Sequence, residues 1–274
     1  MNARHAAGIV AITVVAALVG LAGCALFESE QVAKGRKLFE YYCLHCHGEK
    51  GMGNGFNAKH LDPKPRDLTD KDEEFMGKMS NEEIYEVISR DMLSQEEFDK
   101  KYGEDTDKLF TPSNMPSFKN TLSDAERWSL VAFVRTLHKN TAPKVEIPAQ
   151  AAKERPKFAP VSKPTLASAP AELEKLAEKG KTIYEEKYGC HACHAIGKSG
   201  GIVGPELDRA GFRLNAAWVY RWIKYPQAMK PHSKMPSLGV SDDDALAITA
   251  YLGTLRAGPP AEGSEGGAKQ AAAQ

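Results

Sequence analysis

The sequence predicts an all-α protein in which two similar helical units are joined by a proline-rich linker. Three observations indicate this fold class. No alternating strand pattern longer than a few residues appears anywhere in the chain. Two blocks, 30–140 and 171–256, repeat one order of motifs, and the segment 141–170 between them holds six prolines and almost no large apolar side chain. A length of 274 residues accommodates two domains of ordinary size.

Composition excludes several classes of protein. The chain is 42% hydrophobic and 26% charged, which is ordinary for a globular protein and excludes wholesale disorder. Its 36 basic and 36 acidic residues balance, so charge does not favour nucleic acid as a partner. Beyond residue 23 no apolar run is long enough to cross a bilayer, which excludes a multi-span membrane protein.

The first 23 residues have the pattern of a signal peptide. Basic residues precede an uncharged apolar stretch from Ala6 to Gly23. The stretch ends Leu21-Ala22-Gly23-Cys24, which resembles the lipobox of bacterial lipoproteins. That resemblance implies cleavage before Cys24 and acylation of that cysteine, with 24–29 as a lipid-anchored tether. The alternative is an uncleaved single-pass anchor. Either way we expect an exported protein, anchored to the inner or the outer membrane and facing the periplasm.

Each unit opens with a helix and closes with a capped helix. The opening helices carry a glycine followed four residues later by an aromatic side chain. The closing helices follow a capping box or a near relative of one. The pairs are Gly35/Phe39 and Gly180/Tyr184 for the openings, and Ser123/Glu126 and Ser241/Asp244 for the caps.

The first unit is longer than the second. The cysteine pairs recur after 147 residues but the Met-Pro-Ser motifs after 120, so unit one holds 27 additional residues. The surplus lies around 80–112, where Ser80 and Glu83 form another capping box. The charged stretch 95–108 that follows either steers a basic partner or forms a solvated loop. Residues 257–274, rich in Gly and Ala, are predicted to be a disordered tail.

Both units contain the sequence C-x-x-C-H, which attaches c-type haem. Two thiols one helical turn apart form thioethers with the haem vinyl groups, and the adjacent histidine ligates iron. Zinc would need two further ligands at finger-like spacing, which the units lack. A thiol–disulfide redox pair would need a βαβ context, which is also lacking. We therefore expect two covalently attached haem c groups, held by Cys43, Cys46 and His47 and by Cys190, Cys193 and His194.

The sixth iron ligands are predicted to be Met115 and Met235. Each precedes a proline that stiffens its loop, and each has the same place in its unit. His60 and Met92 are the competitors in unit one. The remaining histidines are predicted to have other roles: His138 as a helix-dipole partner, and His45, His191 and His232 as solvated side chains.

Both units resemble class I cytochromes c. The resemblance runs through Cys43–Gly55, Pro63–Leu68 and Met115–Phe118 in unit one, and through Cys190–His194 and Gly204–Leu207 in unit two. It implies that the opening helix crosses the closing helix, through the glycine–aromatic pairs, at Phe133 and Tyr251. It also implies a backbone carbonyl for Nδ1–H of each haem-ligating histidine, near Pro63 or Pro65 and near Pro205. Two further side chains, Arg213 and Trp218, either bind haem propionates or belong to the surface or the core.

Haem iron ligated by His and Met has no open position for a substrate. We therefore expect an electron carrier and not an enzyme: a membrane-tethered dihaem cytochrome c passing single electrons between periplasmic or membrane redox proteins. The alternatives are a cytochrome subunit of a larger respiratory complex, and a dihaem peroxidase-like enzyme with one open haem. The linker 141–170 is expected to be extended, which would give unit two a wide reach.

Overall fold

The structure is a computed structural model that describes residues 28–69, 76–93, 96–97, 100, 115–138, 144–158 and 169–257. In these ranges the regular secondary structure is helical, apart from an isolated bridge between Ile196 and Ser199. The all-α prediction is confirmed. No helix of the described ranges combines the length and apolarity that crossing a membrane requires. The predicted signal peptide, Cys24 and the C-terminal tail from 258 lie outside these residues.

Unit one begins with α2 (Glu30–Tyr42), whose end leads directly into α3 (Leu44–His47). A short 3-10 turn, η1 (Ala58–His60), precedes α4 (Asn81–Ser89) and α6 (Asp124–Leu137). The capping boxes predicted at Ser80 and Ser123 are both present. Each serine hydroxyl accepts from the backbone N–H of the N3 glutamate, and the carboxylate of that glutamate accepts from the backbone N–H of the serine. Sequence signals therefore locate both helix starts correctly.

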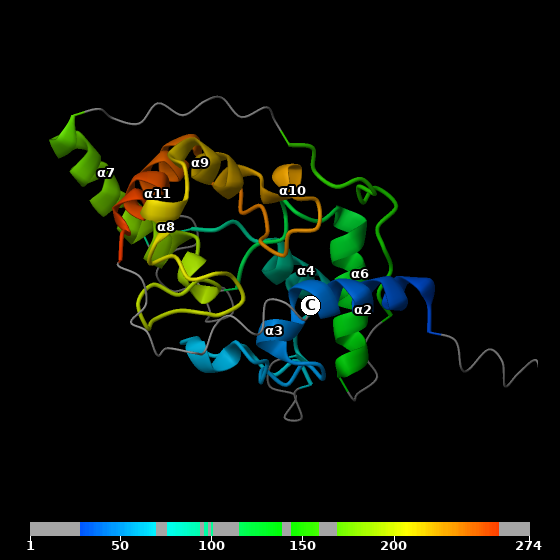
Figure 1. Ribbon diagram of the computed structural model, residues 1–274. Helices are drawn as coiled ribbons and strands as arrows, with labels where there is room; N and C mark the ends of the chain where they lie inside the picture. The colour runs from blue at the N-terminus through cyan, green and yellow to red at the C-terminus, as the bar shows by residue number, and fades with distance from the viewer. Residues whose placement is uncertain are drawn as a thin grey trace, which may run out of the picture.

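Helices α2 and α6 cross (Figure 1), and Gly35 lies at their closest contact. A Cβ at that position would lie 1.9 Å from the backbone oxygen of Ser129, so no larger residue fits. Beside the crossing, Phe39 is fully buried against Phe133, with ring centroids 5.1 Å apart. The expected close crossing of the first and last helices is confirmed for unit one.

Unit two repeats this arrangement. Helix α7 (Pro170–Thr182) ends in a π-helical turn, η3 (Ile183–Lys187), and the short η4 (Cys190–Ala192) follows. Three short helices, α8 (Ala210–Arg213), α9 (Ala216–Lys224) and α10 (Pro226–Met229), precede the closing α11 (Asp242–Thr254).

Helix α7 lies beside α11 (Figure 1) and crosses it at Gly180, where a Cβ would lie 1.9 Å from the backbone oxygen of Ala247. Tyr184 packs near Tyr251, with ring centroids 5.7 Å apart. In both units, therefore, a glycine lies at the helix crossing and an aromatic pair packs beside it. The repeat inferred from sequence is a structural repeat.

Part of the linker packs against unit one, although its sequence holds almost no large apolar side chain. Residues 144–158 lie along unit one, and Val145 is part of its core cluster. The backbone oxygen of Ala152 accepts from the N–H of Ala125, and Arg155 makes a two-pronged ion pair with Glu126 at 2.8 and 2.9 Å. This half of the linker therefore packs against unit one. Its anchors are single side chains whose partners are remote in sequence, so composition alone does not reveal them.

We expect Arg155→Gln to lower the free energy of unfolding by about 1 kcal/mol, since the arginine is partly exposed and its bond to Glu126 is charge-assisted. Burial raises the pKa of Glu126, but the bonds from Arg155 and the Ser123 N–H outweigh it, and the net pKa is lowered. The stability from this carboxylate is present above its unfolded pKa and is lost as pH falls through its folded pKa. Losing Arg155 raises that folded pKa, so acid unfolding should begin at a higher pH.

Urea unfolding of the full chain at neutral and acidic pH measures both effects. The control is Lys157→Gln, whose ion pair with Glu154 is almost fully exposed at 3.9 Å and should contribute nothing measurable. Identical stability and acid midpoints for the two variants would contradict the assigned role of Arg155.

The two units pack against each other. Thr121 Oγ1 accepts from the Ser237 N–H at 2.8 Å, and Tyr41 donates to the backbone oxygen of His232 at 2.6 Å. The additional residues around 80–112 form an insert in unit one, and Met92 of this insert packs on the core of unit two. Glu97, also from the insert, pairs with Lys187 at 2.6 Å. The described part of the insert thus contacts the second unit, and the wide reach expected for unit two is wrong in this arrangement.

Candidate haem-binding sites

The first C-x-x-C-H motif follows α2 without a loop. Cys43 ends α2 and precedes α3, and the His47 N–H donates to its backbone oxygen at 2.9 Å. On the side chain, Nδ1 of His47 lies 3.2 Å from the backbone oxygen of Arg66. Sequence reasoning expected Pro63 or Pro65 to supply that carbonyl, so the position is corrected to the next residue. Because a carbonyl only accepts, Nδ1 carries the proton and Nε2 has its lone pair for a metal.

The second motif has the same geometry. Nδ1 of His194 lies 2.8 Å from the backbone oxygen of Pro205, which confirms the expected partner. Gly204 packs so closely on the imidazole that a Cβ there would lie 2.3 Å from Cε1 of His194. The ring orientation is therefore fixed on one face by the backbone and on one edge by a hydrogen bond.

These residues fit haem c. Burial lowers the pKa of His47 and of His194, although the bonds to Arg66 and Pro205 oppose the shift, and a lowered pKa favours the neutral imidazole. A neutral imidazole with Nδ1–H bonded to a carbonyl presents Nε2 to iron. Four cysteines are free thiols, which leaves each pair available for thioether formation: Cys43, Cys46, Cys190 and Cys193.

The thiols do not resemble those of a redox-active disulfide. Burial raises the pKa of Cys43 and of Cys190 to about 12 each, whereas thiol exchange requires a lowered pKa. Burial, followed by the nearby Cys46 thiol, raises the pKa of Cys193 to about 12. Within the described ranges, no three His, Cys, Asp or Glu side chains gather into a metal-binding cluster.

Met235 is held firmly in its loop. Gln227 donates to its backbone oxygen at 2.5 Å, and its N–H donates to Ser233 Oγ at 3.2 Å. The indole Nε1–H of Trp222 donates to Sδ of Met235 at 3.0 Å. A thioether sulfur has a second lone pair, so this bond leaves Sδ able to ligate iron.

Met115 is half-buried against the core of unit one, and its backbone oxygen accepts from Arg90 at 3.1 Å. Of its sequence competitors, Met92 packs on unit two and His60 belongs to η1. The axial roles of Met115 and Met235 remain predictions.

The expectation that His45 is solvated is wrong. It is 6% exposed, and burial, followed by the charge of Lys234, lowers its pKa to about 4. Lys234 belongs to unit two, so one cause of this shift is a residue of the other unit, which the local sequence does not indicate. His232 is exposed, as expected.

We expect Gly204→Ala to displace the His194 ring, because the added methyl group overlaps the imidazole and the Gly204 N–H is bonded to the Cys193 backbone oxygen at 2.7 Å. The purified variant should lose the low-spin spectrum of one haem while the other is unchanged. Absorption spectra of the full chain measure this, with Gly253→Ala as control because a Cβ there meets nothing within 4 Å. Two unchanged low-spin haems would contradict the assignment of His194.

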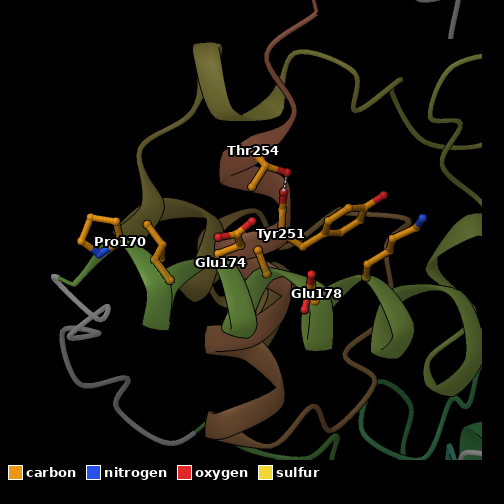
Figure 2. A pocket seen from close by; sticks show the side chains of 8 residues that line it. Pro170, Glu174, Glu178, Tyr251 and Thr254 are labelled. Atoms are coloured by element: carbon orange, nitrogen blue, oxygen red, sulfur yellow. Dashed lines mark hydrogen bonds between the residues drawn. The ribbon is translucent and has the colours of Figure 1, made fainter.

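A shallow groove lies elsewhere in unit two, between α7 and α11 (Figure 2). Its walls include Pro170, Glu174, Glu178, Tyr251 and Thr254. None of its lining residues belongs to Cys190–His194 or to the Met235 loop, so it is not the predicted haem site.

Two helical units that each hold a half-buried C-x-x-C-H motif, with Nδ1 of its histidine bonded to a carbonyl, define a c-type haem protein. The family model for cytochrome c matches residues 32–138 and 177–256, and the chain belongs to the cytochrome c family.

Known proteins are similar to parts of the chain. Cytochrome c oxidase subunit 2 of Alkalihalophilus pseudofirmus is 34% identical over 92 residues, which cover 30% of this chain and 27% of that protein. The chain thus spans about a quarter of the length of this curated relative. A chain of the reducing HAO-like protein complex of Kuenenia stuttgartiensis is 20% identical, with a TM-score of 0.29 over 84% of this chain and 98% of that chain.

Sequence reasoning missed three residues of the sites. Trp222 contacts Met235, Arg66 supplies the carbonyl to His47, and Asn57 lies between the two motifs. Only Trp222 carried a usable signal, since it lies four residues after Trp218 on a short helix near the predicted ligand.

Proposed function

We propose that the protein is a membrane-tethered dihaem cytochrome c, which transfers single electrons between periplasmic or membrane redox proteins. The observation that carries the proposal is the equivalence of His47 and His194, each held through Nδ1 by a carbonyl. Bound haem c supplies one-electron redox chemistry. The chain's own residues hold the imidazoles, partly bury the thiols and position the two candidate methionines.

The proposed axial pair in each unit is a histidine and a methionine: His47 with Met115, and His194 with Met235. Filled axial positions leave the coordination the same in both redox states, which favours electron transfer over substrate turnover. The rigid loop around Met235, held by Gln227 and Ser233, supports such an unchanging geometry.

The membrane tether is a separate part of the proposal. Acylation of Cys24 with more than one chain would anchor the protein firmly, since each buried CH₂ contributes about 0.8 kcal/mol. Mass spectrometry of the detergent-extracted protein should find a lipid on Cys24, and Cys24→Ser should release it to the soluble fraction. An unmodified Cys24 at the end of an uncut signal would contradict the lipoprotein assignment.

Similarity to an oxidase subunit favours one further candidate, a fixed cytochrome subunit of a respiratory complex. Mild-detergent extraction separates the two: co-purification at fixed stoichiometry indicates a subunit, and isolation alone indicates a free carrier.

A reductive titration of the purified full chain tests the central proposal. We expect two haems per chain by mass and two reversible one-electron steps. One haem per chain would reject the dihaem proposal, and steady turnover of peroxide would reject the carrier in favour of the enzyme.

A further inference from the structure

The two C-x-x-C-H motifs meet at the joint between the units. Asn57, just before η1, is wholly buried there. Its Nδ2 donates to the backbone oxygen of Ala192, which stands between the two cysteines of the second motif, at 2.8 Å. The same Nδ2 lies 3.4 Å from Sγ of Cys46 in the first motif. One amide group therefore contacts both haem-attachment sequences.

The other end of the same amide is also engaged by unit two. Oδ1 of Asn57 accepts from the N–H of Ile202 at 2.9 Å. The approach is close because Gly201 has no side chain: a Cβ there would lie 2.0 Å from the backbone oxygen of Ala192 and 2.8 Å from Oδ1 of Asn57. Asn57 thus uses its donor and its acceptor to fasten two segments of unit two to one segment of unit one.

We propose that Asn57 is a positioning residue that locks the two haem-attachment turns together, so that an electron passes between the units through the Cys46–Asn57–Ala192 contact. This inference rests on the proposed function. With haem c bound in both units, each transfer would oxidise a ferrous iron in one unit and reduce a ferric iron in the other by one electron. No bond forms or breaks, and no proton is needed.

A buried amide is suited to this role because all of its polar atoms are satisfied across the joint. Apolar side chains alone would hold the units together with less directional register. Losing Asn57 would leave the Ala192 oxygen and the Ile202 N–H unpaired. Each loss corresponds to about a tenfold shift of the equilibrium from packed units toward separated units.

The test uses the full-length dihaem protein and the variants Asn57→Leu and Thr121→Val. Both substitutions remove polar groups from the joint, but Thr121 contacts Ser237 and neither cysteine pair. Thr121→Val is therefore a matched control for general loosening. Two quantities are measured: hydrogen exchange at the Ile202 amide, and the rate at which an electron placed on one haem by flash reduction equilibrates with the other.

For Asn57→Leu we expect exchange at Ile202 to accelerate by about tenfold or more and inter-haem equilibration to slow. For Thr121→Val we expect equilibration close to the wild-type rate. An unchanged rate in Asn57→Leu would overturn the proposal. Equal slowing in both variants would also overturn it, because Asn57 would then only stabilise the packing of the two units, as Thr121 does.

Two further observations keep the test decisive. If Asn57→Leu does not fold, hydrogen exchange at the Ile202 amide is measured in the wild-type protein. Strong protection of this amide supports the proposed joint, and exchange at the rate of an exposed amide overturns it. If the wild-type chain carries one haem or shows no equilibration, the proposed function fails, whereas unchanged Ile202 exchange in the variant rejects the role of Asn57 alone.

Discussion

Replacing Gly180 with alanine is expected to lower the free energy of unfolding of unit two by about 3 kcal/mol or more, the upper range for overpacking. The added methyl group would lie 1.9 Å from the backbone oxygen of Ala247. Backbone cannot rotate away as a flexible side chain does, so α7 and α11 must separate. That separation also loosens Tyr184 against Tyr251. Denaturant unfolding, followed by haem absorption and by circular dichroism, measures the loss.

The matched control is Gly253→Ala in α11. A Cβ at Gly253 meets nothing within 4 Å, and alanine favours helix over glycine by about 0.5–1 kcal/mol. The same substitution should therefore destabilise at one helix position and stabilise slightly at the other. Equal effects at Gly180 and Gly253 would refute the close helix crossing.

Replacing Met235 with alanine is expected to open the sixth coordination position of the haem iron in unit two and to leave the haem of unit one unchanged. The ferrous protein should then bind carbon monoxide at that haem, and its reduction potential should fall, because axial ligands set haem potentials over roughly 0.8 V. Trp222 would also lose the sulfur to which its Nε1–H donates. Absorption spectra with and without carbon monoxide, with a potentiometric titration, measure both changes.

Met229→Ala is the control, because Met229 is an exposed methionine at the end of α10 and is not a predicted ligand. It should bind no carbon monoxide and keep its potential. Carbon monoxide binding that is equal in both variants, or absent from Met235→Ala, would reject Met235 as a ligand.

Local sequence signals predicted the fold well. The family resemblance implied both helix crossings at the glycine–aromatic pairs. Serine followed three residues later by glutamate located the starts of α4 and α6, and the motifs of the two units recur in the same order. These devices act over a few residues or recur at fixed spacing, so one sequence is enough to detect them. The partner of His194 at Pro205 was predicted through the family resemblance, since a proline marks the loop that turns its carbonyl inward.

Contacts between distant segments could not be predicted. Asn57 is an ordinary polar residue in a loop, and nothing local indicates that it meets Ala192 in the other unit. The same holds for Arg155, whose carboxylate partner Glu126 lies on α6, and for His45, whose pKa is lowered by burial and by the charge of Lys234 in unit two. Such pairings depend on how the two units are placed, and no periodicity or spacing encodes that placement in a single chain.

The most direct test of the account is a spectrum of the purified full chain. The ferric protein is examined for the methionine–iron charge-transfer band, and carbon monoxide is then added to the ferrous protein. The account predicts two methionine-ligated haems and no carbon monoxide shift. Carbon monoxide binding at either haem of the unmodified protein would contradict it, because an open iron is the site of catalysis or sensing and not of a closed electron relay.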